Sequence, residues 1–157
     1  MLEVARKAYA VRDMYVTDPR YMPVSVDNPL SREFLERIKL SFRDTTALPY
    51  SGDTTFFAVA DSSGWIVAGI QSLFHPFGSY VTEPRFNITL NSRASSFSLD
   101  PSSVNRLEPR KKTMHTLSAI ILEENSRVLA IGLTGGHYRP LLHAQLVTNI
   151  VDYEMKI

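Results

Sequence analysis

Two hydroxyl side chains and a pair of glycines offer the chemistry in this sequence. Thr54 follows Gly52–Asp53 at the start of an extended stretch, Ser72 comes eighteen residues later, and Gly135–Gly136 precede a helix-like segment. A threonine hydroxyl is a poor nucleophile, but its own α-amino group can serve as base when the threonine is the first residue of a chain. With a pKa near 8, that amine accepts a proton around neutral pH and returns it to a leaving amine. These residue types therefore allow acyl transfer, provided that the bond before Thr54 has been cut.

Each of these residues also fits an ordinary structural role. Thr54 and Thr55, taken alone, are more common as plain strand residues, and Ser72 fits a solvent-facing strand position. Gly135–Gly136 fits a strand-to-helix turn. Because glycine adopts positive φ and lets the backbone approach a substrate closely, a turn here is compatible with donation of two amides to an oxyanion.

The composition excludes other classes of site. The 157 residues carry 17 basic and 16 acidic side chains, a net charge of +1, which gives no electrostatic reason to expect nucleic acid or a membrane surface as a partner. Without cysteine there are no disulfides or thiolate sites. The spacing of His75, His137 and His143 forms no HxH or HxxxH pair, so we expect no metal and no cofactor. No apolar stretch approaches the roughly 20 residues of a membrane span. We expect a soluble chain, with the compartment open and the cytoplasm slightly favoured.

The helical segments are predicted from apolar spacing and from capping residues. Residues 2–15 space their apolar side chains as an amphipathic helix does. Ser31 can cap a second helix that ends near Phe42, after a loop over residues 19–29. Pro140 opens a last helix that ends near Asp152.

Strands are predicted from β-branched and aromatic residues between turn residues. Residues 54–60 and 65–73 predict a hairpin around the turn Asp61–Gly64. Residues 86–90 predict a short strand, followed by a long irregular loop. The nearly continuous apolar runs at 116–122 and 127–133 predict two buried strands. Antiparallel hairpins with helices packed outside make the fold class α+β.

The order of these pieces resembles gamma-glutamyltransferases over nearly the whole chain. Tyr9–Asp13 with Asp18–Pro19 is similar to the segments that close the family's large subunit, and Gly52–Phe56 is similar to the motif at which the precursor cleaves itself. Further matches follow in family order and spacing: Asp61 and Gly64, Phe77–Ser79, Leu90–Asn91, Phe97–Ser98, Lys111 and Gly135–Gly136. Several segments, among them Gln71–His75 and Ser95–Pro101, resemble an acylase-like branch.

The resemblance implies part of an N-terminal-nucleophile hydrolase fold, a four-layer α/β/β/α sandwich with two antiparallel sheets. Cleavage is expected between Asp53 and Thr54, so residues 1–53 are expected to end the large subunit and residues 54–157 to form most of the small subunit, together one incomplete domain. The uncapped start of the first helix suggests that upstream chain is missing. We therefore expect association with the missing large-subunit segment or a homo-oligomer.

The family's site residues map onto named positions of this chain. Thr54 is expected to be nucleophile and base, Ser72 to orient it, and Gly135–Gly136 to supply the oxyanion amides. Ser95 and Ser96 stand where transpeptidases carry an acid that pairs with the substrate's α-ammonium, and His115–Thr116 stand where they carry two serines that bind the α-carboxylate. The missing acid disfavours a γ-glutamyl donor and favours a glutaryl-type amide, which has no ammonium to leave unpaired.

The predicted function is amide hydrolysis or acyl transfer through an acyl-threonine, on γ-glutamyl or glutaryl-type amides, including glutathione-like substrates. A small-molecule amide is therefore the expected ligand. The alternative is a truncated or degenerate, non-catalytic family member that acts only with a partner chain. Phe56 replaces the histidine that follows the paired threonines in the family, which is a further departure from the transpeptidase pattern.

Overall fold

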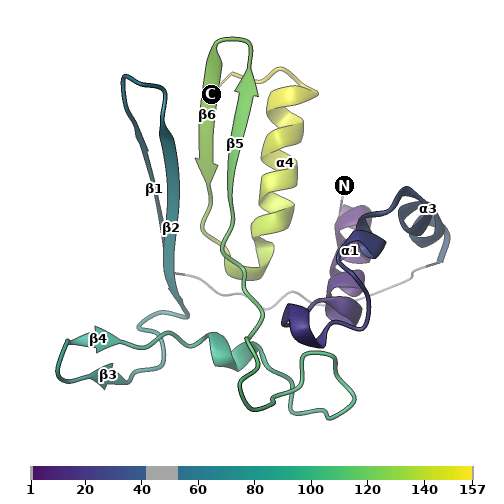
Figure 1. Ribbon diagram of the computed structural model, residues 1–157. Coiled ribbons are helices and arrows are strands. Elements are labelled where there is room, and N and C mark those ends of the chain that lie inside the picture. Colours follow the sequence, from purple (N-terminus) through teal and green to yellow (C-terminus); the bar gives the residue numbers. More distant parts are fainter. Residues whose placement is uncertain (1, 42–52, 157) are drawn as a thin grey trace. The chain divides into compact units, whose positions relative to one another are not determined.

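A computed structural model describes residues 2–41 and 53–156 of the chain (Figure 1). The described residues form two compact units: one from residues 2–41 and 94–115, the other from residues 53–93 and 116–156. Both helices and antiparallel strands are present, so the predicted α+β class is confirmed. This division is based on packing, so it does not test the predicted division of the chain at a cleavage point between Asp53 and Thr54. Among the described helices, none is long and apolar enough to cross a membrane.

The first unit contains the N-terminal helices. They are α1 (Leu2–Tyr15), η1 (Pro19–Tyr21), α2 (Asp27–Leu30) and α3 (Arg32–Ser41). The predicted first helix is confirmed, and so is the cap of the later helix, because the Ser31 hydroxyl accepts the N–H of Phe34 at 3.2 Å. The predicted end near Phe42 lies outside the described residues. Two short helical turns, η1 and α2, interrupt the expected loop. Val11 and Phe34 are buried, and the Phe34 ring meets Tyr15 edge-on at 5.9 Å.

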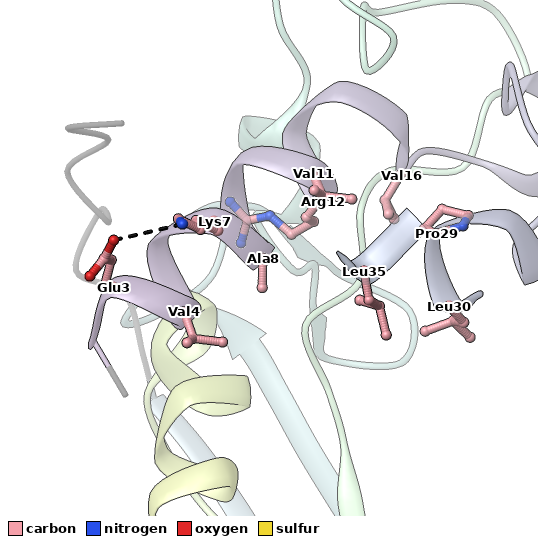
Figure 2. A pocket seen from close by; sticks show the side chains of 10 residues that line it. All are labelled: Glu3, Val4, Lys7, Ala8, Val11, Arg12, Val16, Pro29, Leu30 and Leu35. Carbon is pink, nitrogen blue, oxygen red and sulfur yellow. Dashed lines mark ion pairs between the residues drawn. The ribbon is translucent and has the colours of Figure 1, made fainter. Parts of the chain in front are cut away.

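An apolar cavity lies between α1 and the segment of α2 and α3. Figure 2 shows its lining, which is mostly aliphatic, and its volume is about 620 Å³. Val4 and Leu30 on its wall are about 70% exposed, and Glu3 and Lys7 form an ion pair of 3.6 Å beside it. Among the residues that the structure describes, no hydroxyl or imidazole side chain lines it. It therefore lacks the groups that amide chemistry needs.

Asp18 joins two parts of the first unit that are far apart in sequence. Its carboxylate is buried and accepts from the backbone N–H of Arg20 at 3.1 Å and from the Arg20 guanidinium at 2.8 Å. It also accepts the N–H of Lys112 at 2.8 Å. The hydrogen bonds from the Arg20 side chain, and then that from Lys112, hold the pKa of Asp18 well below its ordinary value.

We expect the stability of the protein to depend on the charge of Asp18 at acid pH. Because the folded pKa lies below the unfolded value near 3.9, the stabilisation is fully present above pH 4 and is lost as the pH falls toward the folded pKa. Asp18→Asn should lower the unfolding midpoint at pH 7 and flatten its dependence on pH below 4. Urea unfolding of the parent and variant at several pH values measures this. Parallel curves, with the same pH dependence, would contradict it.

The second unit is built from hairpins. Its strands are β1 (Asp53–Ala60), β2 (Ile66–Phe74), β3 (Thr82–Glu83), β4 (Ile88–Thr89), β5 (Ala119–Glu124) and β6 (Arg127–Gly132). They pair antiparallel in order, β1 with β2, β3 with β4, and β5 with β6. The predicted first turn is confirmed: the Asp61 carboxylate accepts the N–H of Ser63 at 2.8 Å and of Trp65 at 3.0 Å, and Gly64 has φ +90°.

Two strand predictions need correction. The strand predicted over residues 86–90 is only Ile88–Thr89, paired with a strand at Thr82–Glu83 that the sequence did not suggest. The later hairpin begins three residues after Thr116, and its predicted full burial is wrong, because Ile121 is 49% and Val128 is 41% exposed while Ile131 is buried. A continuous apolar run still places alternate side chains on opposite faces, so in β5 Ile120 and Leu122 are partly buried while Ile121 is exposed. In β6 the start of the strand is exposed and burial increases toward Ile131.

Phe56 and Gly132 join the two long hairpins. Figure 1 shows β1–β2 and β5–β6 side by side, with α4 (Arg139–Val151) along β5. The ring of Phe56 in β1 lies over Gly132 in β6, where a β-carbon would overlap the ring near its attachment point. The Phe57 ring covers Gly69 in the same way, but there the overlap involves the far end of the ring. Gly132 therefore allows the hairpins to approach closely.

We expect Gly132→Ala to destabilise the protein by about 1 to 3 kcal/mol, as overpacking typically does, because the base of the Phe56 ring cannot move without moving β1. Gly69→Ala is the matched control and should change stability by less than about 1 kcal/mol, because the half-exposed Phe57 ring can swing away. Urea unfolding compares the two. Equal losses of stability in both variants would show that the contact of Phe56 with Gly132 is no more sensitive to an added β-carbon than the contact of Phe57 with Gly69.

Candidate active site

Thr54 and Ser72 lie directly opposite each other on β1 and β2. Opposite residues of an antiparallel pair share a face, with their β-carbons about 5 Å apart. Asp53 pairs with Phe74 and Thr54 pairs with Ser72, so Leu73 has no pairing partner and the register shifts between Asp53 and Thr54. Phe74 has a positive φ of +80° at this irregularity. The Ser72 hydroxyl accepts the N–H of Phe74 at 2.9 Å. A strand irregularity next to Thr54 therefore fixes the position of the Ser72 oxygen.

Arg139 connects Thr54 to the chain around α4. Its side chain is fully buried, and Nη2 donates to the Thr54 hydroxyl oxygen at 3.1 Å. Nε donates to the carbonyl of Leu133 at 2.6 Å, and Nη1 donates to the carbonyl of Thr116. Burial lowers the pKa of Arg139, and the charge of Arg93 lowers it further. One guanidinium therefore holds oxygens from three separate segments.

Gly135 and Gly136 form a turn with two consecutive positive φ angles, +129° and +50°. The carbonyl of Gly135 accepts the N–H of Tyr138 at 2.8 Å at the start of η3 (Gly136–Tyr138). A β-carbon on Gly135 would lie 3.1 Å from Leu142. Consecutive amides in such a turn form a concave donor surface that suits an oxyanion. The hydrogen bond from Arg139 to Leu133 holds the turn at its base.

Phe74 is the buried centre of the same unit. Its ring meets His137 edge-on at 5.6 Å, and the Arg93 guanidinium lies 5.3 Å from its centre. Arg93 Nη1 also donates to the Thr116 hydroxyl at 3.2 Å. The aromatic ring thus places Arg93 beside Thr116, whose carbonyl is held by Arg139.

The histidines of this unit have ordinary protein partners. The Ser92 hydroxyl lies 3.0 Å from Nδ1 of His75, and the Ser118 hydroxyl lies 3.4 Å from Nδ1 of His143. Burial, and then the charge of Arg139, lower the pKa of His143. Within residues 2–41 and 53–156, no three histidine or acidic side chains are grouped in a way that could hold a metal ion.

The remaining predicted site residues lie in the first unit. Ser95 and Ser96 belong to η2 (Arg93–Ser96), where the carbonyl of Ser96 accepts from the Asn105 amide at 2.6 Å, and His115 is exposed. Lys111, named above as a family match, is buried, with Nζ 2.7 Å from the carbonyl of Val104 and 3.2 Å from Glu108. Those two oxygens offset the burial of its charge.

Sequence reasoning missed Arg139 and Arg93. For Arg139 a signal existed, because it is the first residue of α4, where the helix dipole disfavours a cation, and a basic residue there needs a compensating reason. For Arg93 no such signal exists, since its contacts come from Phe74 and Thr116, far away in the sequence. Among the predicted residues, the structure brings Thr54, Ser72, Thr116 and the two glycines into one unit.

This α+β chain forms part of the N-terminal-nucleophile hydrolase fold, which is a four-layer sandwich with antiparallel sheets. The cephalosporin acylase from Bacillus halodurans matches with a TM-score of 0.70 and 33% identity, over 90% of this chain and 27% of that one. A gamma-glutamyltranspeptidase from Pseudomonas nitroreducens matches with a TM-score of 0.58 and 26% identity, over 65% and 58% of the two chains.

The model of the Gamma-glutamyltranspeptidase family matches residues 1–157, so the chain belongs to that family. It is 37% identical to the oxamate amidohydrolase proenzyme of Klebsiella pneumoniae, over 96% of this chain and 30% of that protein. It is 34% identical to the glutathione hydrolase-like YwrD proenzyme of Bacillus subtilis, over 99% and 30%. The chain therefore spans about 30% of the length of these curated relatives.

Proposed function

We propose that the complete protein is a proenzyme that cleaves itself between Asp53 and Thr54 and then hydrolyses amides through Thr54. The observation that carries this proposal is the pairing of Thr54 with Ser72 at the irregular start of the hairpin, with Arg139 donating to the Thr54 hydroxyl. Membership of the Gamma-glutamyltranspeptidase family and the proenzyme names of the relatives support it.

The chemistry would proceed in two acyl-transfer steps. The α-amine of Thr54 takes the hydroxyl proton as Oγ1 bonds to the amide carbon, and the developing oxyanion accepts hydrogen bonds from the Gly135 and Gly136 amides. The amine then gives the proton to the leaving nitrogen, which departs and leaves an acyl ester on Thr54. Water, or an acceptor amine, attacks that ester by the same route, which releases the acid or a new amide and restores the hydroxyl.

The proposed substrates are amides whose acyl group carries a carboxylate and no ammonium. The sequence supports this choice, because Ser95 and Ser96 replace the acid that pairs with an α-ammonium in transpeptidases. The names of two relatives agree with it, since one acts on oxamate, the monoamide of a dicarboxylic acid, and another is an acylase. The roles of Ser95, Ser96 and His115 in recognition stay predictions from the sequence.

The test of this function uses the full-length protein. Intact mass spectrometry after purification should show two fragments that meet between Asp53 and Thr54, and the purified protein should release aniline from glutaryl anilide. A single uncut chain without hydrolysis would instead support the alternative, a family member that does not catalyse. Cleavage without glutaryl hydrolysis would leave the nucleophile assignment in place and overturn the proposed substrate class.

A further inference from the structure

Arg139, which lies outside the predicted site, contacts the proposed nucleophile. Its Nη2 lies 3.1 Å from the Thr54 hydroxyl oxygen. A guanidinium can only donate hydrogen bonds, so this contact occupies an acceptor position of the hydroxyl oxygen. The hydroxyl proton must therefore point toward another acceptor, and in a cleaved protein the α-amine of Thr54 is available on the same residue.

Burying the positive charge of Arg139 at the start of a helix is energetically unfavourable. The side chain is fully buried, it is the first residue of α4, and burial lowers its pKa. Among the described residues, no carboxylate lies within ion-pair distance of it, and its partners are the neutral oxygens of Thr54, Leu133 and Thr116. A buried cation in the first turn of a helix opposes both solvation and the helix dipole. No neutral side chain carries N–H donors on three nitrogens, so the hydrogen bonds and the charge of Arg139 must be separated by experiment.

We infer that Arg139 is a positioning residue whose charge keeps the Thr54 α-amine neutral after cleavage, in addition to holding the hydroxyl; this inference rests on the proposed function. The α-amine of a threonine lies about 3 to 4 Å from its own Oγ1 by standard bond geometry. The guanidinium therefore lies within roughly 7 Å of the amine. A like charge at such a distance disfavours the ammonium form, and in a water-poor site it shifts the amine's titration by about one pH unit or more.

Among the groups that the structure describes next to Arg139, Arg93 and His143 do not oppose the effect. Arg93, at the end of the segment after β4, carries a second positive charge that also acts on Arg139. His143 on α4 has a lowered pKa and so favours its neutral form, while His75 and His137 lie against Phe74. Arg139 and Arg93 act in the same direction. The amine can then accept the hydroxyl proton near neutral pH.

The test compares Arg139→Gln, which keeps a neutral donor, with Arg139→Lys, which keeps the charge but loses the forked geometry. For each full-length variant, self-cleavage is measured by intact mass, folding by thermal unfolding, and kcat/KM for glutaryl anilide from pH 5 to 10. We expect the acidic limb of the Gln profile to move up by about one pH unit or more, with a tenfold or greater loss at pH 7. The Lys profile should stay near that of the parent.

The other outcomes distinguish a role of the Arg139 charge from a purely structural role of its side chain. If the Gln variant folds but does not cleave itself while the Lys variant does, the charge acts in the precursor, which has no free α-amine, and the inference as stated fails. If both variants lose rate equally without a shift of the acidic limb, or neither cleaves, Arg139 is only a clamp for Leu133 and Thr116 and the inference fails. If the parent itself neither cleaves nor hydrolyses, the proposed function fails and the inference fails with it, an outcome distinct from an active parent with an unshifted variant.

Discussion

Thr54→Ala should abolish both self-cleavage and amide hydrolysis, with a loss of at least about a thousandfold in rate. One hydroxyl is proposed to attack the Asp53 carbonyl in the precursor and the substrate carbonyl in the mature protein, so its removal stops both reactions. Intact mass of the full-length variant measures the first reaction, and release of aniline from glutaryl anilide measures the second.

Thr55→Ala is the matched control for this experiment. Thr55 is the neighbouring residue with the same side chain, but it is exposed on the opposite face of β1 and pairs with Gln71. It should cleave and hydrolyse nearly as the parent does. Thr54→Ser, which keeps a hydroxyl and can still form an α-amine, should cleave more slowly. Cleavage by the Thr54→Ala variant would remove Thr54 as the nucleophile.

Ser72→Ala should lower kcat by about tenfold to a hundredfold and leave KM nearly unchanged. Ser72 lies opposite Thr54, and its oxygen is held by the N–H of Phe74, so its own proton can be directed to the Thr54 oxygen. Losing one orienting hydrogen bond typically costs about 1 to 3 kcal/mol, which corresponds to that range of rates. Steady-state kinetics of the mature protein give kcat and KM separately.

Two further variants separate orientation from strand stability. Ser72→Thr keeps the hydroxyl and suits a strand, so it should retain most of the rate. Gln71→Ala removes an exposed neighbour from the other face of β2 and should change neither kcat nor the unfolding temperature by much. If Ser72→Ala turns over at the parent rate, Ser72 is an ordinary strand residue.

Local sequence was sufficient for the first helix, for a helix cap and for the hairpin that carries Thr54 and Ser72. The apolar spacing of residues 2–15 predicted α1, and Ser31 was predicted as a cap that its hydrogen bond to Phe34 confirms. The turn at Asp61–Gly64 predicted the hairpin that places Ser72 opposite Thr54, because a hairpin with a defined turn has a defined register. The family could also be recognised from the order of short motifs, and its match over residues 1–157 confirms it.

Burial was harder to predict, since it depends on which faces the tertiary structure covers. Lys111 is charged, yet it is buried, because Val104 and Glu108 supply oxygens within hydrogen-bond distance of its Nζ. The strands that contain Ile121 and Val128 were expected to be buried, but both of these side chains remain exposed. Phe56 departed from the family pattern without an evident reason until its ring was found over Gly132 on the neighbouring hairpin.

From the sequence alone, the nucleophile candidate, its partner hydroxyl and the glycine turn were assigned through the resemblance to the family, because the order and spacing of short motifs can be read along the chain. Only the tertiary structure decided that Arg139 donates to Thr54, since that contact joins residues 85 positions apart. Its three acceptors come from β1, from the segment before β5 and from the segment after β6. Local patterns carry no information about such convergence, because it arises only when separate hairpins and a helix pack together.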